Sequence, residues 1–209
     1  MGGDYYNALK ALARTVRERH DVSTSDLGIA TMKRICKAEG ITKIDLWKHK
    51  LRKVRAAYFV DGDDSFILLN ANIKPVEPRL FSLAHELKHH LTDRDLAIES
   101  PLGCDTSAVT DSRPPIEIGA EVFAAEFIFP EAECRDWIYS QLGSRECTKE
   151  EVVRLKRSCP AKISYTFLVK RLEWFRLIKR GSFAGVQFRK LEEKLYGVPF
   201  YRRRYGARR

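Results

Sequence analysis

Two histidines and a glutamate on one predicted helix are the residues of this sequence best suited to chemistry. Residues 79–91 read R-L-F-S-L-A-H-E-L-K-H-H-L, and apolar residues at helical spacing predict an amphipathic helix there. His85 and His89 are four positions apart, which puts them on one face of that helix, about 6 Å apart. Two imidazoles so placed can bind one Zn²⁺, and Glu86 between them can reach a water molecule held by the metal.

This H-E-x-x-H spacing is unlike what composition alone produces. With five His and 16 Glu in 209 residues, about 0.009 chance matches are expected. The motif also lies inside an apolar-faced helix rather than in a loop. The alternative is that the two histidines are ordinary polar residues of a helix surface. The sequence favours a zinc site of the kind used by zinc peptidases.

A third ligand is needed, because a catalytic zinc usually has three protein ligands and one open position. Residues 116–129 carry an apolar stripe between flanking prolines, which predicts a second helix. On it, Glu117 and Glu121 are four positions apart and project from one side. An acidic pair on an apolar helix is costly to bury unless a cation compensates. The simplest arrangement makes Glu117 a ligand and Glu121 its outer partner; the alternative is that both are solvated.

The two motifs together resemble the ImmA/IrrE family of metallopeptidases. That family has H-E-x-x-H after an aliphatic-alanine pair, then a helix of the form E-x-x-A-N-x-F-A-x-x-L-L-M-P. This chain reads F-S-L-A-H-E-L-K-H-H and, beginning 28 residues after the second motif histidine, E-I-G-A-E-V-F-A-A-E-F-I-F-P. The resemblance implies Zn²⁺ held by His85, His89 and Glu117, with Glu86 as the catalytic carboxylate.

Two positions depart from the family pattern, and the resemblance also implies a substrate. Glu121 stands where the family commonly has Asn, and Lys88 where it often has Gly. Members of the family typically cut a helix-turn-helix repressor during a stress response or mobile-element induction. We therefore expect a zinc-dependent endopeptidase with such a repressor as its protein partner. The alternatives are a nucleic-acid-binding transcriptional regulator, or an antitoxin-like partner protein, with a vestigial zinc site.

The elements around these motifs predict a mainly helical α+β fold of the zincin-like type, with a small antiparallel sheet and C-terminal helices. We expect helices at 5–19, 131–142 and 148–157, a helix that follows a cap cluster at 23–26 and runs to about residue 38, and a helix that includes 167–175 and is ended by Gly181. We expect strands at 41–47, 55–60 and 66–69. The last strand is expected to be an edge strand that pairs with substrate, and Asn70 at its end is a substrate contact or a turn residue. Tyr58 and His90 are the candidates for stabilising an oxyanion. Residues 92–115 predict a long loop that contains Cys104.

Basic charge gathers near the C-terminus. Residues 176–209 contain 11 Lys and Arg against two Glu, which is +9 of the net charge of +10. Nucleic acid is a candidate partner for this segment, alongside an acidic protein or no partner at all. We expect a metallopeptidase domain at 1–142, a helix pair resembling a helix-turn-helix at 143–181, and a basic, aromatic tail at 182–209. The spacing of Tyr196, Phe200 and Tyr201 favours a tail that packs against the rest of the chain.

Several classes of protein are disfavoured. No apolar run approaches the 18 residues of a membrane span, and the first residues have no signal-peptide pattern. The five cysteines are odd in number and contain no C-x-x-C, which suits free thiols in a reducing compartment. We therefore expect a cytoplasmic protein that has no membrane partner.

Overall fold

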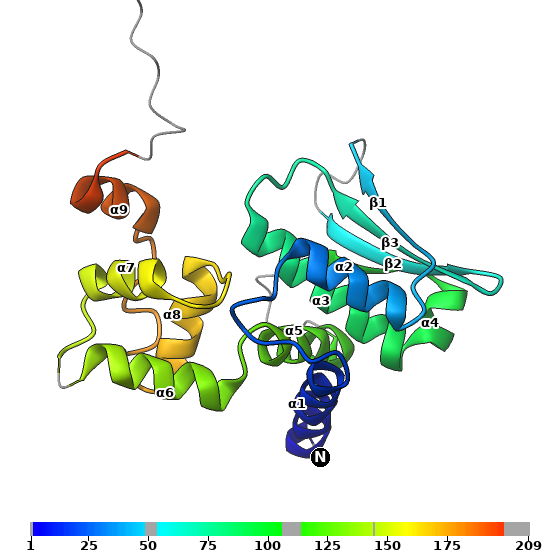
Figure 1. Cartoon of the computed structure of the whole chain (residues 1–209), viewed down its shortest axis with the longest axis horizontal. Coiled ribbons are helices and arrows are strands. Elements are labelled where there is room, and N and C mark those ends of the chain that lie inside the picture. The colour runs from blue at the N-terminus through cyan, green and yellow to red at the C-terminus, as the bar shows by residue number, and fades with distance from the viewer. Residues whose placement is uncertain (1, 49–53, 106–113, 144, 199–209) are drawn as a thin grey trace, which may run out of the picture. The chain divides into compact units, whose positions relative to one another are not determined.

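A computed structural model describes residues 2–48, 54–105, 114–143 and 145–198 (Figure 1). The predicted α+β fold, mostly helical with a small sheet, is confirmed. In chain order, the elements of the described residues are α1 (Gly2–Arg19), α2 (Ile29–Ala38), β1 (Lys43–Trp47), β2 (Val54–Asp61), β3 (Asp64–Asn70), α3 (Val76–Thr92), α4 (Arg94–Glu99), β4 (Leu102–Asp105), α5 (Pro115–Ile128), α6 (Glu131–Leu142), α7 (Lys149–Ser158), α8 (Tyr165–Trp174) and α9 (Phe188–Tyr196). None of these helices combines the length and the apolar character that crossing a membrane requires.

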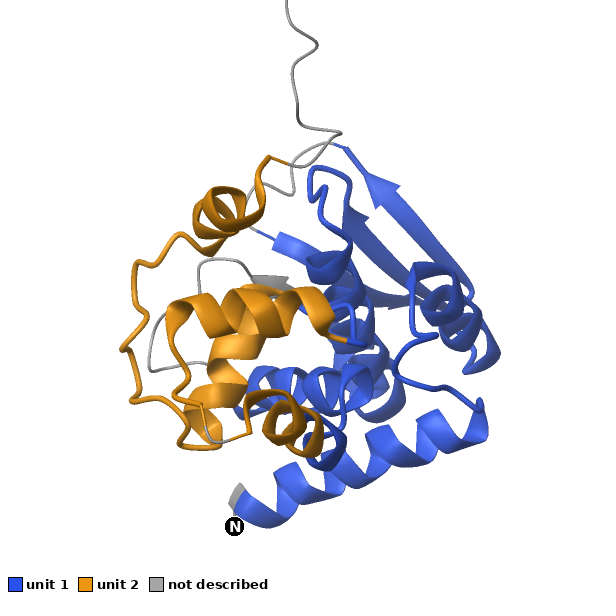
Figure 2. Cartoon of the chain, turned by 60° about the vertical axis from the view of Figure 1, so that its left-hand side comes forward, with its two compact units in different colours: residues 1–134, 160–163 blue, residues 135–159, 164–209 orange. Residues whose placement is uncertain are grey.

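The chain divides into two compact units (Figure 2). Unit 1 comprises Met1–Cys134 and Pro160–Ile163, and unit 2 comprises Arg135–Cys159 and Ser164–Arg209. Helix α6 begins in unit 1 and continues into unit 2. The three-part division at residues 142 and 181 stays a prediction.

The sheet of unit 1 is mixed, with strand order β1-β3-β2-β4. β1 runs parallel to β3, whereas β2 is antiparallel to both β3 and β4. Two expectations are therefore wrong: the sheet is not wholly antiparallel, and β3, the strand before α3, is interior rather than an edge. The β2–β3 hairpin is visible in sequence because Gly62 marks its turn, with a φ of 58° that suits glycine. The pairing of β1 with β3 is a non-local contact that no local pattern encodes.

Helix α3 lies between the sheet and α5, and this position buries most of its surface. It contacts β2, β3 and β4 of the sheet as well as α2 and α5, and α1 packs on α5 in turn. Leu80, Leu83 and Leu87 of α3 are fully buried. Burying a leucine side chain contributes about 1.5–3 kcal/mol, so this helix is anchored along the stretch that carries the histidines.

Helix α1 approaches α5 closely at Gly119. A Cβ atom at this position would lie 2.7 Å from the hydroxyl of Tyr5 and 2.8 Å from a methyl carbon of Leu9. Both distances are shorter than van der Waals contact, so any larger residue here would force the side chains of Tyr5 and Leu9 to move. The chain thereby holds α5 between α1 and α3.

Three predicted boundaries are wrong. Helix α2 begins at Ile29, because the side chains of Ser23 and Asp26 bond to each other in a turn instead of capping the helix. Helix α8 ends at Trp174, and Arg176 two residues later has a φ of 59°, which no α-helix continues. The expected loop at 92–115 contains α4 and β4. Cys104 therefore lies in a strand, and its side chain is outside the described part of the chain.

Unit 2 is built from short, capped helices. The side chains of Thr148 and Ser164 accept hydrogen bonds from the first turns of α7 and α8. Helix α9 contacts α7, and the guanidinium of Arg157 lies 4.2 Å from the ring centroid of Tyr196. Tyr196 contacts α7 of unit 2 but stays 47% exposed, so packing of the tail against the peptidase domain stays a prediction. Phe200 and Tyr201 lie outside the described residues.

Candidate metal centre

Three side chains of unit 1 bring metal-binding atoms together. His85 and His89 of α3 point their Nε2 atoms toward each other, 3.2 Å apart. Glu117, in the first turn of α5, places Oε2 3.0 Å from Nε2 of His85 and Oε1 3.4 Å from Nε2 of His89. The structure thus brings together the three residues that sequence analysis selected as ligands.

These distances fit a zinc ion. Zinc bonds to His N and carboxylate O are about 2.0–2.2 Å long, so the donor atoms of a tetrahedral site lie about 3.3 Å apart. The two Nε2 atoms are 3.2 Å apart, and the Glu117 carboxylate approaches them to 3.0 Å through Oε2 and to 3.4 Å through Oε1, so each pair of residues comes close to this spacing. Both histidines are buried, while Glu117 remains partly open to solvent. The donor set of two His and one Glu, with one accessible side, is that of a catalytic rather than a closed structural zinc site.

The electrostatics favour a charged Glu117. Burial raises the pKa of this carboxyl group, but hydrogen bonds from His85 and His89 outweigh it and bring the pKa to about 2. Burial lowers the pKa of His85 despite its bond to Glu117, which favours the neutral imidazole that metals bind. Burial also acts to lower the pKa of His89, but Asp93 and Glu117 raise it to about 9.

Two residues of this site were missed by sequence analysis. Asp93 caps the end of α3, and its Oδ2 accepts a hydrogen bond of 2.7 Å from Nδ1 of His89. Lys88 is fully buried and donates to the same oxygen, also at 2.7 Å. The spacing of His89 and Asp93, four positions apart at a helix end, is a sequence signal that predicts such a contact. Nothing in the local sequence predicts the burial of Lys88.

Two other carboxylates lie near the histidines. Glu86 is fully buried on α3, and its charge is among the causes that raise the pKa of His89. Glu121 lies one turn beyond Glu117 on α5, and its charge acts to raise the pKa of His85. Glu121 is not among the three grouped donors. The catalytic role of Glu86 and the outer role of Glu121 stay predictions.

The other candidates take part in contacts within the fold. The hydroxyl of Tyr58 lies 3.0 Å from Nδ1 of His90, whose Nε2 lies 2.9 Å from the carbonyl oxygen of Glu39. These bonds give both side chains partners within the fold, and an oxyanion role for Tyr58 or His90 stays a prediction. The amide of Asn70 donates to the Val54 carbonyl and its oxygen accepts the Asn72 N–H, as a turn residue does. A substrate contact by Asn70 stays a prediction.

The H-E-x-x-H helix packs on a small sheet, and the helix α5 brings a glutamate to both histidines. This arrangement is typical of a class of metallopeptidases. Residues 24–158 match the model of the IrrE N-terminal-like domain of the M78 peptidases. The chain therefore belongs to this ImmA/IrrE family of metallopeptidases. No curated protein matches the chain significantly.

Proposed function

We propose that this chain is a zinc-dependent endopeptidase that cuts a helix-turn-helix transcriptional repressor. The observation that supports the zinc-dependent activity is the meeting of His85, His89 and Glu117: the two Nε2 atoms are 3.2 Å apart, and each has an oxygen of Glu117 within 3.4 Å. Membership of the family supports peptide hydrolysis, and the repressor substrate rests on the family resemblance alone.

The chemistry divides between the ligands and Glu86. His85, His89 and Glu117 would hold zinc, which when bound supplies Lewis-acid activation of water and of the scissile carbonyl group. Glu86 follows His85 directly on α3, where its buried carboxylate can accept the proton of the attacking water. The same carboxyl group then returns the proton to the leaving amine. Asp93 keeps His89 in the tautomer that leaves Nε2 for the metal.

The substrate strand needs a different place from the one expected. β3 is flanked by β1 and β2 and offers no edge. Among the described residues β4 pairs with β2 alone, and it also contacts α3, the helix that carries the histidines. β4 is therefore the edge at which we propose that an extended substrate segment adds to the sheet.

Glu86→Gln tests the peptidase proposal. Zinc-loaded wild type, Glu86→Gln and Glu126→Gln are each incubated with helix-turn-helix proteins encoded beside the gene, and fragments are counted by mass spectrometry. Glu126 is a matched control, because it is an equally buried glutamate on α5 that accepts from Arg14. Glu86→Gln should retain zinc and lose about 10²–10⁴-fold in rate, and Glu126→Gln should cleave normally. Cleavage by Glu86→Gln near the wild-type rate would contradict the mechanism.

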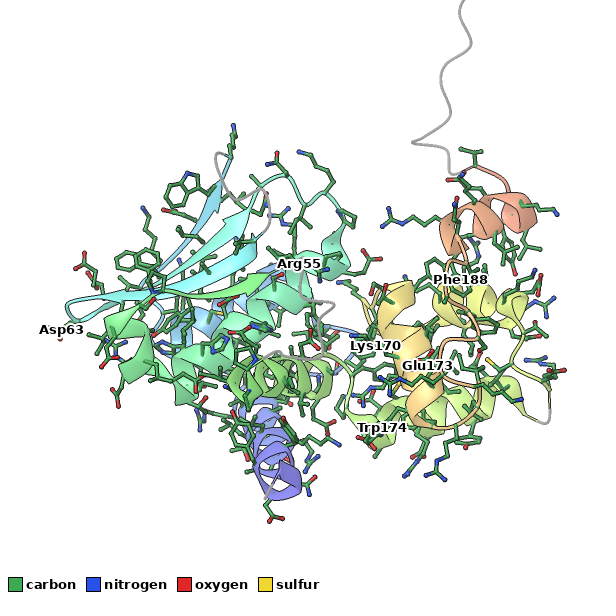
Figure 3. All side chains as sticks on the ribbon, turned by 180° about the vertical axis from the view of Figure 1, so that it is seen from behind. Arg55, Asp63, Lys170, Glu173, Trp174 and Phe188 are labelled. Atoms are coloured by element: carbon green, nitrogen blue, oxygen red, sulfur yellow. The ribbon has the colours of Figure 1, made fainter. Side chains whose placement is uncertain are left out.

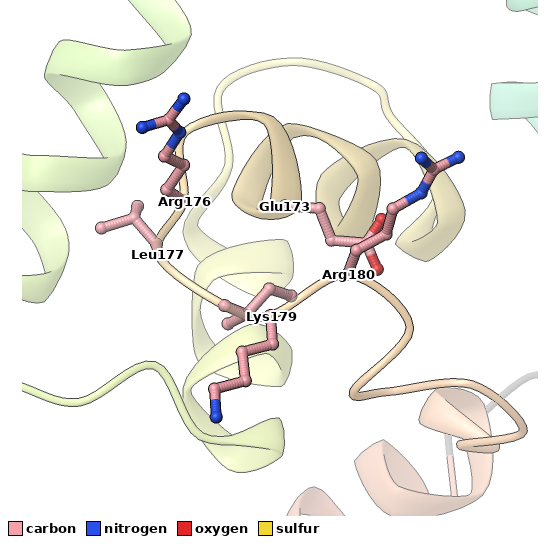
Figure 4. Close-up of a pocket in the computed structure, with 6 residues that line it drawn as sticks. Glu173, Arg176, Leu177, Lys179 and Arg180 are labelled. Carbon is pink, nitrogen blue, oxygen red and sulfur yellow. The ribbon is translucent and has the colours of Figure 1, made fainter.

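A second candidate function is nucleic-acid binding by unit 2, which its surface charge favours. Arg176, Lys179 and Arg180 line an open hollow of about 480 Å³ that follows α8 (Figure 4). On α8 itself Lys170 is exposed, and Trp174 is 65% exposed (Figure 3). Cations beside an aromatic ring suit phosphates and stacked bases. Fluorescence titration with a labelled single-stranded oligonucleotide over a range of salt concentrations tests this function. An affinity that does not change with salt concentration, or the absence of binding, excludes it.

A further inference from the structure

Lys88 is a buried cation that the hydrolytic chemistry does not use. It lies on α3 immediately before the ligand His89 and has no exposed surface. An ammonium group is costly to bury unless charged or polar partners compensate. Its partners are therefore informative about why the chain places a lysine there.

The first partner of Lys88 is the carboxylate that orients a ligand. Oδ2 of Asp93 accepts one hydrogen bond from Nζ of Lys88 and another from Nδ1 of His89, both at 2.7 Å. Because one oxygen receives both bonds, the lysine fixes the position of the atom that holds the His89 ring. The Nε2 atom of that ring is then directed at His85 and Glu117.

The second partner of Lys88 is on the other ligand helix. Nζ also lies 3.2 Å from the carbonyl oxygen of Ile116, the residue that precedes the ligand Glu117. This bond ties the first turn of α5 to α3 at the level of the metal-binding atoms. The ring of Tyr5, from α1, lies 6.0 Å from the same ammonium group.

We propose that Lys88 is a positioning residue of the metal site, which holds His89 through Asp93 and Glu117 through the Ile116 carbonyl. The inference rests on the proposed zinc site and deepens it. Its consequence is that metal affinity depends on a side chain that does not touch the metal. Loss of an outer partner of a ligand typically weakens metal affinity 10–100-fold, and Lys88 serves two ligands.

The test compares Lys88→Met with Arg17→Met. Arg17 is the matched control: it is also buried and donates to a carbonyl of α5, but to that of Phe127 at the opposite end of the helix. Zinc affinity is measured by competition with a chelator, and cobalt(II) absorption reports the ligand geometry. Lys88→Met should bind zinc at least about tenfold more weakly and shift the cobalt bands. Arg17→Met should change neither the affinity nor the bands.

A second pair of variants guards against a folding defect in Lys88→Met. Lys88→Gln keeps a polar N–H donor without the charge, and its affinity should lie between those of wild type and Lys88→Met. In an Asp93→Asn background, Lys88→Met should cost less than it does alone, because part of its effect runs through Asp93.

The outcomes separate the inference from the proposed function. Wild-type affinity and unshifted cobalt bands in both Lys88 variants overturn the role of Lys88 and leave the metal site standing. Equal losses in Lys88→Met and Arg17→Met also overturn it, since they indicate general destabilisation. A wild-type chain that binds no zinc overturns both proposals.

Discussion

The two units of this chain place their charges in opposite ways. Unit 1 contains 19 Lys and Arg against 21 Asp and Glu, and several acidic, basic and histidine side chains among its described residues are buried. These are Arg17, His85, Glu86, Lys88, His89 and Glu126. Unit 2 contains 19 Lys and Arg against 7 Asp and Glu, and Glu151 is the only charged side chain buried among its described residues.

This difference indicates two ways of using charge. A buried charge has fixed partners and little screening, so its removal leaves those partners unsatisfied. Exposed charges act mainly through their sum, and salt screens them. Single substitutions should therefore have large and specific effects in unit 1, and small, additive effects in unit 2.

The largest effect is expected at the third ligand. Glu117→Ala should weaken zinc binding by at least about a hundredfold, because the metal loses a directly bonded carboxylate. Glu121→Ala, on the same helix one turn on, should weaken it by about tenfold or less. Chelator competition measures both affinities. If Glu121→Ala loses zinc and Glu117→Ala keeps it, the ligand assignment is wrong.

Arg17→Met should show the next largest effect, on stability instead of metal binding. Its guanidinium donates to the Phe127 carbonyl at 2.6 Å and to the Thr24 hydroxyl at 3.0 Å, so both acceptors lose a donor in the variant. The free energy of unfolding should fall by about 1–3 kcal/mol. Urea denaturation measures this change. An unchanged midpoint would show that this buried charge adds nothing to the stability of unit 1.

The candidate ligands, which the structure brings together, could be selected from sequence because their signals are local. His85, Glu86 and His89 lie within one helix turn or so, and the helical period fixes their common face. The choice of Glu117 needed one further inference, namely that its helix packs against the helix of the two histidines. The apolar stripes of both helices and the flanking prolines supported that inference.

Most of the remaining features depend on contacts between distant segments. Lys88 reaches the carbonyl of Ile116, 28 positions away, and no periodicity encodes that bond. The interior position of β3 depends likewise on a pairing with β1. The end of α8 depends on the positive φ of Arg176, a conformation that arginine rarely adopts. Tertiary structure decides the first two features, whereas the end of α8 is a local turn in which the N–H of Leu177 bonds to the carbonyl of Leu172.

The pH dependence of stability at Glu39 tests whether a unit 1 charge with fixed partners contributes more than an exposed one. Burial acts to raise the pKa of its carboxyl group, but hydrogen bonds from His20 and Arg19 lower it below the ordinary value. A carboxyl group with a depressed folded-state pKa adds stability above its unfolded pKa of about 4.3, and this is lost as the pH falls through the folded value. Glu39→Gln should therefore cost about 1 kcal/mol at pH 7 and less at pH 3, because part of the contribution is lost as the pH falls below the unfolded pKa.

Urea denaturation at both pH values measures the Glu39 effect. Asp45→Asn is the control, because the Lys43–Asp45 pair is largely exposed and should contribute less at either pH. An equal loss for Glu39→Gln at pH 7 and pH 3 would show that the charge of Glu39 is not what stabilises this contact.

The smallest effects per residue are expected on the surface of unit 2. Lys179 and Arg180 are exposed beside the hollow that follows α8, so Lys179→Gln and Arg180→Gln should each change the unfolding free energy by less than about 0.5 kcal/mol. If unit 2 binds nucleic acid and each of these side chains neutralises one phosphate, each substitution should also reduce the slope of log affinity against log salt by about 0.7–0.9. The double variant should show the sum of the two changes, because exposed charges that share no buried partner act independently of each other. A single substitution that abolished binding would indicate a specific site in unit 2, and the contrast between the two units would then fail.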